Sequence, residues 1–364
     1  MKRLLCILSS MNAGGAETFL MKVYRNIDKT KYQFDFCVNS KERGFYDKEI
    51  KDLGGFIYHI PSKSENLKLF KKELKNIIVR NEYEYVLRIT ANAAGLMDLK
   101  IAKKSGAKKC IARSSNSNCE KGIKNKISHI LGKVLYLKYV DVAIAPSKLA
   151  ADYTFGNFGS NRVSIIHNAL NVYDYKYSKL DRDRIRKEFN LQDNAIVFGN
   201  IGRFMIQKNH VFLINVFEKI HEQNKDTYLM LVGNGELESK IQNLVISKGL
   251  EKYVLFIGIR SDIPKILSSL DLLIMPSLYE GMPNTVIEAQ ANGLPCVISD
   301  TITKEANITG LVKYVSLSES YRSWADIALE SISKNRLNTY EHFFRNNYDI
   351  NSVTEQFIDI IFGD

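Results

Sequence analysis

Residues 277–289 read SLYEGMPNTVIEA, and this stretch decides the fold. The residues before it, 270–275, are apolar except at Asp271, which is typical of a buried parallel strand. Glycine, proline and asparagine then break the chain, and apolar residues resume at helical spacing from Val286. A strand, a loop and a helix start therefore follow one another. In open α/β sheets this arrangement places a ligand at the carboxyl end of the strand, and the helix N-terminus favours an anion such as a phosphate.

Two carboxylates flank the expected anion site, Glu280 before the turn and Glu288 within the helix. They would repel a phosphate unless they faced other groups, such as sugar hydroxyls. A purely structural interpretation is also open for Glu288, because Thr285 and Glu288 have the spacing of a capping box, which closes a helix start.

The length and composition favour a globular protein with two domains. The chain has 364 residues, of which 45% are hydrophobic and 25% charged, so two ordinary cores are expected and disorder is not. No apolar run approaches the ~18 residues that span a bilayer. The start, MKRLLCIL, imitates a signal peptide. Its apolar segment is shorter than the ~7 to 15 residues required, so we expect it to form the first strand.

The cysteines are odd in number and have no Cys-x-x-Cys spacing. They are Cys6, Cys37, Cys110, Cys119 and Cys296. Most lie in or beside strand-like apolar runs. This pattern favours buried free thiols in a reducing cytoplasm and argues against a zinc site.

Positive charge is concentrated in the first half of the chain. The net charge is +11; residues 1–170 carry 30 Lys and Arg against 15 Asp and Glu, and the rest carries 21 against 25. This asymmetry predicts that the N-terminal half meets an anionic surface or substrate. Nucleic acid is not expected, because no nucleic-acid-binding motif occurs and aromatic residues do not interleave with the basic runs. The inner-membrane surface is the better candidate partner, and we expect a cytoplasmic protein that is peripheral to that membrane.

Residues 121–139 predict a basic amphipathic helix, in which five lysines alternate with Ile, Leu and Val residues. Two interpretations are open. The helix either packs on its own sheet as an ordinary surface helix, or lies on anionic lipid as an interfacial helix. The two interpretations are compatible.

Strand and helix patterns alternate along the chain, which predicts parallel, doubly wound sheets. In the first half, strands are expected near residues 33–38, 56–60, 83–89, 109–112, 140–145 and 163–167. The stretch 171–193 is polar and charged, and it is the expected linker.

Two further loops that follow strand-like runs carry groups suited to an anion. Gly14 and Gly15 follow the first strand, where paired glycines let backbone N–H groups approach a ligand. Arg203 and Lys208 follow a later strand, and two cations at such a place suit a diphosphate. Plain connecting or solvated loops remain open as alternatives. The Gly-x-Gly at 233–235 lacks the third glycine of a dinucleotide fingerprint, which argues against an NAD enzyme.

Together these stretches resemble the retaining glycosyltransferase family 4, which has the GT-B fold. The resemblance is carried by Glu280 and Glu288 with Gly-x-Pro-Asn between them, by the Gly-Gly-x-Glu loop at 14–17, and by the Gly-Arg and Lys-Asn pairs at 202–203 and 208–209. Residues 279–300 look like the branch that builds bacterial capsules and exopolysaccharides.

The fold that this resemblance implies is α/β, with two Rossmann-like doubly wound domains facing across a cleft. The acceptor-side domain is expected at 1–170 and the nucleotide-sugar donor domain at 171–346. A terminal helix at 347–364 is expected to cross back to the N-terminal domain.

The resemblance also implies a reaction. A hexose or N-acetylhexosamine moves with retention from a nucleotide diphosphate sugar, expected to be UDP-linked, to a growing and lipid-linked surface polysaccharide. The implied catalytic residues are Arg203, Lys208 and Glu280, of which the two cations stabilise charge on the leaving diphosphate. No cofactor or metal is expected, since no Asp-x-Asp motif occurs in a donor-site context. The implied donor-binding residues are Gly14, Gly15, Gly202, Gly233, Asn234, Gly258, Ile259, Gly281, Met282, Pro283, Asn284, Thr285 and Glu288, the last facing the ribose.

The chain departs from the family at two first-domain strands. Many relatives have histidines at the carboxyl ends of these strands, where this chain has Arg88 and Arg113. Arg88, Arg113 and Asn116 are therefore expected to bind an anionic acceptor. The lost histidines leave open a non-catalytic nucleotide-sugar-binding subunit of a polysaccharide assembly complex. A GT-B sugar-nucleotide epimerase is also open, although no convincing carboxylate pair occurs in the first domain.

Overall fold

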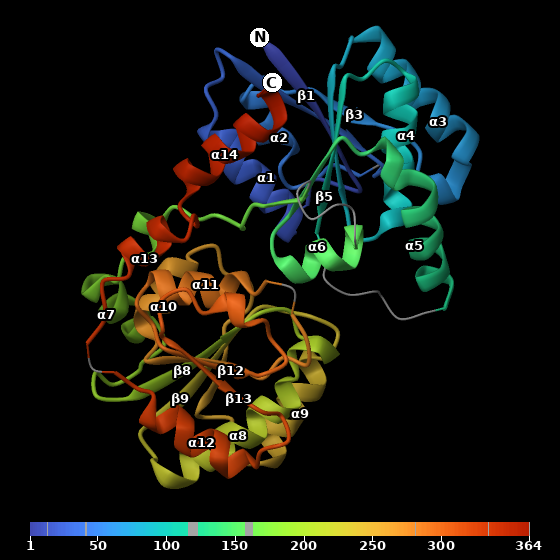
Figure 1. Cartoon of the computed structure of the whole chain (residues 1–364). Coiled ribbons are helices and arrows are strands. Elements are labelled where there is room, and N and C mark those ends of the chain that lie inside the picture. The colour runs from blue at the N-terminus through green and yellow to red at the C-terminus, as the bar shows by residue number, and fades with distance from the viewer. Residues whose placement is uncertain are drawn as a thin grey trace. The chain divides into compact units, whose positions relative to one another are not determined.

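The computed structural model divides into two compact units, Met1–Leu170 with Asn347–Asp364, and Asn171–Asn346 (Figure 1). Each unit is a parallel sheet with helices packed on it, so the predicted doubly wound class is confirmed. The structure describes residues 1–12, 14–40, 42–115, 123–156, 163–280, 282–333 and 335–363.

The first unit is built on a seven-stranded parallel sheet in the order β3-β2-β1-β4-β5-β6-β7. Its strands are β1 (Lys2–Leu8), β2 (Tyr32–Val38), β3 (Ile57–His59), β4 (Tyr85–Thr90), β5 (Lys109–Ser114), β6 (Val142–Ala145) and β7 (Val163–Ile165). Successive residues of β1 face opposite sides, since Leu4 and Cys6 lie in one core cluster and Leu5 lies in the other. The prediction that the apolar start of the chain forms the first strand is confirmed, and this strand lies inside the sheet between β2 and β4.

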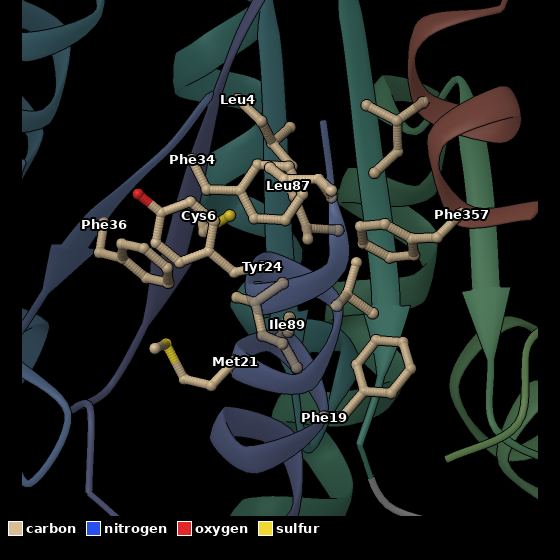
Figure 2. Packing of buried hydrophobic residues seen from close by; sticks show 14 of the residues in the cluster. Leu4, Cys6, Phe19, Met21, Tyr24, Phe34, Phe36, Leu87, Ile89 and Phe357 are labelled. Carbon is tan, nitrogen blue, oxygen red and sulfur yellow. The ribbon is translucent and has the colours of Figure 1, made fainter. Parts of the chain in front are cut away.

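Helices cover both faces of this sheet. They are α1 (Gly15–Asn26), α2 (Asp47–Asp52), α3 (Lys63–Arg80), the short η1 (Ala93–Leu96), α4 (Met97–Lys104), α5 (Ile123–Tyr136), η2 (Leu137–Tyr139), α6 (Lys148–Phe155) and α14 (Ile350–Phe362). Figure 2 shows the cluster under α1 and α14, where Phe19 and Phe357 meet edge to face with ring centroids 5.7 Å apart. The last helix of the chain thus completes the core of the first unit.

The second unit is built on a six-stranded parallel sheet in the order β10-β9-β8-β11-β12-β13. Its strands are β8 (Ile196–Ile201), β9 (Thr227–Val232), β10 (Val254–Phe256), β11 (Leu272–Met275), β12 (Cys296–Ser299) and β13 (Val312–Val315). Its helices are η4 (Val172–Tyr175), α7 (Lys179–Glu188), η5 (Ile206–Lys208), α8 (His210–Gln223), α9 (Glu238–Ser247), α10 (Ile263–Ser269), α11 (Asn284–Ala291), η6 (Lys304–Ala306), α12 (Tyr321–Glu330) and α13 (Tyr340–Arg345). Trp324 is fully buried in its core.

The prediction of a linker at 171–193 is wrong. Helix α7 lies within this stretch, and Ile185 packs in the core of the second unit. Arg186 is 1% exposed; its guanidinium donates to Asp271 at 2.7 Å and to the Ala195 carbonyl at 2.8 Å. The polar composition does not indicate this helix. The residue that attaches it to the unit is the buried Arg186, and its acidic partner, Asp271, lies far along the chain.

Within the described residues, no helix combines the length and apolarity needed to cross a membrane. Cys6, Cys37, Cys110 and Cys296 are buried free thiols, and burial raises the pKa of each. Cys119 lies outside the described residues. The buried thiols agree with the interpretation of the cysteine pattern.

Candidate functional site

Apart from Gly14 and Gly15, which belong to the first unit, the predicted donor residues lie on or just after loops that leave the same edge of the second sheet. From β8 the chain runs outward through β9 and β10 and then returns to the other side of β8 with β11. This is a topological switch point, beyond which open α/β sheets bind their ligands. Asn200 ties the two central strands together, because its side-chain amide donates to the Ile274 carbonyl at 2.7 Å.

The predicted catalytic residues Lys208 and Glu280 meet at this edge. Lys208 Nζ donates to Glu280 Oε1 at 2.7 Å, and the two side chains are only 16% and 10% exposed. The side-chain amide of Gln207 donates to the Tyr279 carbonyl at 2.8 Å and to Glu280 Oε2 at 3.3 Å. These bonds join the loop after β8 to the loop after β11.

Asn209 joins the same two loops on the other side of Lys208. Its backbone is left-handed, with φ 55°, and turns the chain into α8. Its side-chain amide donates to the Pro276 carbonyl at 3.1 Å. The Lys-Asn pair predicted from sequence therefore consists of one charged residue and one residue that fixes the loop.

Arg203 differs from Lys208, because it is exposed and has no ion pair within the described part of the chain. It follows Gly202, where a Cβ would lie 2.9 Å from Lys208 Cε. The lysine stem thus packs over the backbone just ahead of Arg203. One cation of the predicted pair is neutralised inside the protein, and the other is available to an anion.

The predicted glycines bring three loops close together. Gly233 has φ +133°, and a Cβ there would lie 2.2 Å from the Gly202 carbonyl oxygen. The Gly233 N–H donates to the Gly258 carbonyl at 2.8 Å. The Asn234 carbonyl accepts a hydrogen bond from the loop after β8 at 2.8 Å. Ile259, which follows Gly258, is exposed. The loops after β8, β9 and β10 therefore form one continuous backbone surface.

Helix α11 begins without a side-chain cap. Pro283 is the N-cap residue in an extended conformation, and Thr285 lies inside the helix. The capping-box interpretation of Thr285 and Glu288 is therefore wrong. The Thr285 hydroxyl instead donates to the Ile201 carbonyl at 3.5 Å, a weak contact that links the helix to the end of β8.

Glu288 lies one turn into α11 beside Tyr175 of η4. Burial raises the pKa of the Tyr175 hydroxyl, and the Glu288 carboxylate raises it further by charge and by accepting its hydrogen bond. Asn284 begins the helix, and Met282 packs against the core of the second unit. Gly281 lies outside the described residues.

His210, the first residue of α8, is buried and stacks on Phe204 with ring centroids 4.5 Å apart. Burial and then the charge of Lys208 lower the pKa of His210 to about 4. The imidazole is therefore neutral at pH 7, so it does not add a cation beside Lys208.

In the first unit, the predicted glycine loop begins α1. Gly14 is the N-cap residue and Gly15 opens the helix. A Cβ at Gly14 would lie 2.4 Å from Glu17 Oε2. Burial raises the pKa of this carboxyl group. The Gly-Gly-x-Glu sequence thus folds its glutamate back over the helix start.

Arg88 is buried in an ion pair. Its Nε lies 3.1 Å from Asp98 Oδ2, and Lys63 Nζ lies 2.6 Å from the other oxygen of this fully buried carboxylate. The charge of Arg88 is thereby balanced within the first unit, and its predicted contact with an acceptor stays a prediction.

Arg113 lies on the opposite face of the sheet, since β4 and β5 pair Ile89 with Arg113. It is 1% exposed, donates to Asn168 Oδ1 at 2.8 Å and places its guanidinium 3.7 Å from the Phe19 ring centroid. Arg88 and Arg113 therefore cannot share one anion. Asn116 lies outside the described residues.

Sequence reasoning missed Tyr175, Gln207 and His210 as neighbours of the site. Gln207 and His210 flank the predicted Lys-Asn pair, so their positions in the loop were a usable signal. Tyr175 had no such signal, because only the packing of η4 against α11 brings it to Glu288.

Comparisons with known proteins identify the family. Residues 181–348 match the family model described as glycosyl transferases group 1. The chain is 32% identical over 342 residues to EpsF of Bacillus subtilis, which is named as a glycosyltransferase, covering 92% of this chain and 89% of the relative. It is 26% identical to the capsular polysaccharide biosynthesis glycosyltransferase CapH of Staphylococcus aureus, covering 99% and 98%. A third relative, the Escherichia coli UDP-Gal:alpha-D-GlcNAc-diphosphoundecaprenol alpha-1,3-galactosyltransferase, is 26% identical over 74% of this chain and 72% of its own length.

Solved structures agree with the observed fold. HepE of Anabaena in complex with UDP and glucose superimposes with a TM-score of 0.76 at 18% identity, covering 99% of both chains. A glycosyltransferase of Rickettsia africae superimposes with a TM-score of 0.81 at 16% identity, covering 99% of this chain and 97% of that one. The chain therefore belongs to the group 1 family of glycosyltransferases and has the GT-B fold.

Proposed function

We propose that this glycosyltransferase transfers a hexose or N-acetylhexosamine, with retention and without a metal, from a UDP-linked sugar to a growing, lipid-linked surface polysaccharide. It acts in the cytoplasm, peripheral to the inner membrane where such an acceptor is presented. It needs no cofactor beyond the donor substrate.

The observation that carries the proposal is the Lys208–Glu280 pair beside the exposed Arg203, at the switch point of the second sheet. Arg203 supplies a planar fork for two phosphate oxygens, and Lys208 supplies a second cation. With two cations fixed at one sheet edge, charge on the leaving diphosphate can be stabilised without a divalent ion.

The chemistry assigns a role to each group. The bond between the sugar's anomeric carbon and the β-phosphate oxygen breaks, and the acceptor hydroxyl forms its bond on the same face of the sugar. The hydroxyl proton passes to the leaving phosphate oxygen. Phosphate oxygens compete with Glu280 for Lys208, which turns the Glu280 carboxylate toward the sugar. Glu288, oriented by Tyr175, accepts hydrogen bonds from the ribose hydroxyls.

The names of similar proteins support the choice of donor and acceptor. The Escherichia coli relative is named for a UDP-galactose donor and a diphosphoundecaprenol-linked acceptor. HepE has been crystallised with UDP-glucose, as well as with UDP and glucose. The CapH relative is named for capsular polysaccharide biosynthesis.

The test is a panel of UDP-, GDP- and ADP-sugars incubated with the purified protein, with and without EDTA, while nucleotide release is measured. One UDP-sugar should release UDP at a rate that EDTA does not change. In Arg203→Ala and Lys208→Ala this rate should fall roughly 100-fold or more, the usual effect of removing a group that stabilises transition-state charge. Lys252→Ala is the matched control, because Lys252 is exposed at the opposite edge of the same sheet.

Other outcomes separate the alternatives. Thermal stabilisation by a nucleotide sugar without turnover, even when lipid-linked acceptors are added, would favour the binding subunit. Conversion of the sugar nucleotide to an isomer without nucleotide release would favour the epimerase. Loss of turnover in EDTA would contradict the metal-independent mechanism.

A further inference from the structure

Helix α5 is attached to the first unit by its polar and small residues. Its buried residues are His129 and Gly132. A Cβ at Gly132 would lie 2.4 Å from the Ala93 carbonyl carbon, so the helix backbone packs directly on η1. The Ala93 N–H donates to His129 Nδ1 at 3.1 Å, and His129 Nε2 donates to the Tyr153 carbonyl at 3.0 Å. Glycine contact and histidine hydrogen bonds, rather than an apolar seam, hold this helix.

The apolar residues of α5 face away from this attachment. They are Ile123, Ile127, Ile130, Leu131, Val134 and Leu135, all of them exposed. At 3.6 residues per turn they form a stripe about 140° wide, centred roughly opposite His129 and Gly132. Ile123 is 78% exposed and Val134 74% exposed, and no residue of the stripe belongs to a core cluster. A surface helix normally turns such a stripe toward the core.

Lysines accompany the stripe. By the same helical geometry, Lys124 lies just inside one border, between Leu131 and Leu135, and Lys126 and Lys133 lie beyond the other border. The sequence of α5 contains no Asp or Glu. Lysine stems at such borders extend along apolar surface while their ammonium groups reach polar surroundings.

The groove beside α5 is basic as well. Figure 1 shows α5 next to α4, and a cavity of about 220 Å³ lies there. Its lining residues are Lys71, Met97, Lys100, Ile101, Lys104 and Tyr136, without an acidic side chain. Lys100 Nζ lies 5.8 Å from the Tyr136 ring centroid. The groove therefore adds three lysines on the Tyr136 side of the helix, in the same part of the first unit as the stripe.

We propose that α5 docks this protein on an anionic lipid bilayer, with the stripe at the level of the headgroup and acyl boundary and the lysines on lipid phosphates. An apolar stripe bordered by lysines is the pattern of helices that lie in a membrane interface. A second copy of this chain fits less well, because pairing two α5 stripes would bring like charges together without any α5 carboxylate. Membrane docking rests on the proposed function in one respect only: it would give the enzyme access to a lipid-linked acceptor.

The experiment is flotation of the full chain with vesicles of phosphatidylethanolamine and phosphatidylglycerol, compared with pure phosphatidylcholine vesicles. The protein should float with the anionic vesicles, and salt should weaken the binding. Lys124→Gln with Lys126→Gln should weaken it about 25-fold, at about fivefold per lysine. Ile127→Ser with Val134→Ser should weaken it by roughly tenfold or more, because the inserted apolar area is lost.

Matched controls lie in the second unit. Lys240→Gln with Lys252→Gln and Ile246→Ser alter exposed residues of the same types, and vesicle binding should not change. Val134→Trp adds a second indole to the buried Trp324. Brominated lipid should quench the new fluorescence if the stripe inserts.

Other outcomes would overturn the proposal or assign the stripe to a different role. Equal vesicle binding by the stripe variant and the parent protein would overturn the proposal, as would unquenched Val134→Trp fluorescence on bound vesicles. Concentration-dependent dimers that Ile127→Ser with Val134→Ser abolishes, without vesicle binding, would assign the stripe to self-association. UDP release from the donor in the absence of vesicles should be the same in all these variants, so failure of docking is distinct from failure of the proposed reaction.

Discussion

Gly233 lies where two loops of the second unit approach each other closely. Its φ of +133° disfavours any side chain, and a Cβ would clash with the Gly202 carbonyl oxygen. Gly258 also has a positive φ, +67°, but nothing lies within 4 Å of the position of its Cβ. Backbone conformation therefore favours glycine at both positions, but only at Gly233 does the available space also require it.

We predict that Gly233→Ala lowers the free energy of unfolding by about 3 kcal/mol or more and raises the KM for the donor, because strain and a clash add. Gly258→Ala should cost only about 1 to 2 kcal/mol, the backbone strain alone. Urea unfolding and donor titration measure both effects. Equal costs at the two positions would show that the clash is relieved by a shift of the loop.

His210 makes the stability of the second unit depend on pH. Its pKa is about 4 in the folded protein and 6.5 in a free side chain, through burial and then Lys208. Between these values the unfolded chain binds a proton that the folded protein does not, so stability is full above pH 6.5 and falls as the pH drops toward 4.

We expect the loss attributable to His210 to reach about 3 kcal/mol at pH 4. His210→Gln should flatten this part of the profile, since glutamine does not titrate. Chemical unfolding at pH 7, 5.5 and 4 measures the slope. Parallel profiles for the parent protein and the variant would contradict the assignment, because the slope would then arise from other titrating groups.

At the scale of single elements, α11 takes its orientation from η4. Tyr175 supports Glu288 from a segment that precedes the whole second sheet in sequence. The helix start itself has no side-chain cap. The position of Glu288 therefore depends on packing between two elements more than on the local sequence of α11.

Tyr175→Phe should weaken donor binding about 3- to 10-fold, the effect of losing one hydrogen bond of about 1 kcal/mol. The kcat should change little, because Tyr175 acts through Glu288 and the ribose and not at the anomeric carbon. Isothermal titration with UDP and steady-state kinetics separate the two quantities. Tyr173→Phe is the control, since that tyrosine is exposed on the same short helix. A fall in kcat with unchanged KM would argue against this role.

Elements with strong local patterns could be predicted from the sequence. The strand before Glu280 and the first strand both had apolar runs that the structure retains as buried strands. Helix α7 could not be predicted, because the anchor Arg186 pairs with Asp271 from another element. The apolar pattern of α5 predicted the helix correctly but not its orientation, which Gly132 and His129 decide.

Some contacts of the candidate site could likewise be predicted from the sequence, and others could not. Lys208 and Glu280 could be predicted as neighbours, because each follows a parallel strand at one switch point. The pairing of Arg88 with Asp98 could not, since it depends on which face of β4 the side chain occupies and on the packing of α4. Strand parity predicts the face only when the register is known.

At the scale of the whole molecule, the two units have separate cores, and α14 belongs to the first. Phe357 is fully buried against Phe19 and near Phe34. Lys2 Nζ donates to the Phe362 carbonyl at 2.8 Å, so the first strand and the last helix meet. The first unit is thus made from both ends of the described chain.

Phe357→Ala should destabilise the first unit by about 3 to 5 kcal/mol, as for other phenylalanines removed from cores. The second unit should keep its own unfolding transition. Calorimetry and limited proteolysis can follow both transitions. Phe344→Ala, at a partly exposed position of α13, is the control and should leave both nearly unchanged. A single shifted transition would show instead that the two units unfold together.

The place of α14 in the chain also determines which unit can complete its core first during translation. The apolar face of the first sheet emerges early, yet the helix that covers it is translated only after the entire second unit. The second unit can close its core during elongation, whereas the first must wait for α14 to leave the exit tunnel. Throughout that interval Phe19 and Phe34 lack their last partner, so the nascent first unit is a natural client for chaperones.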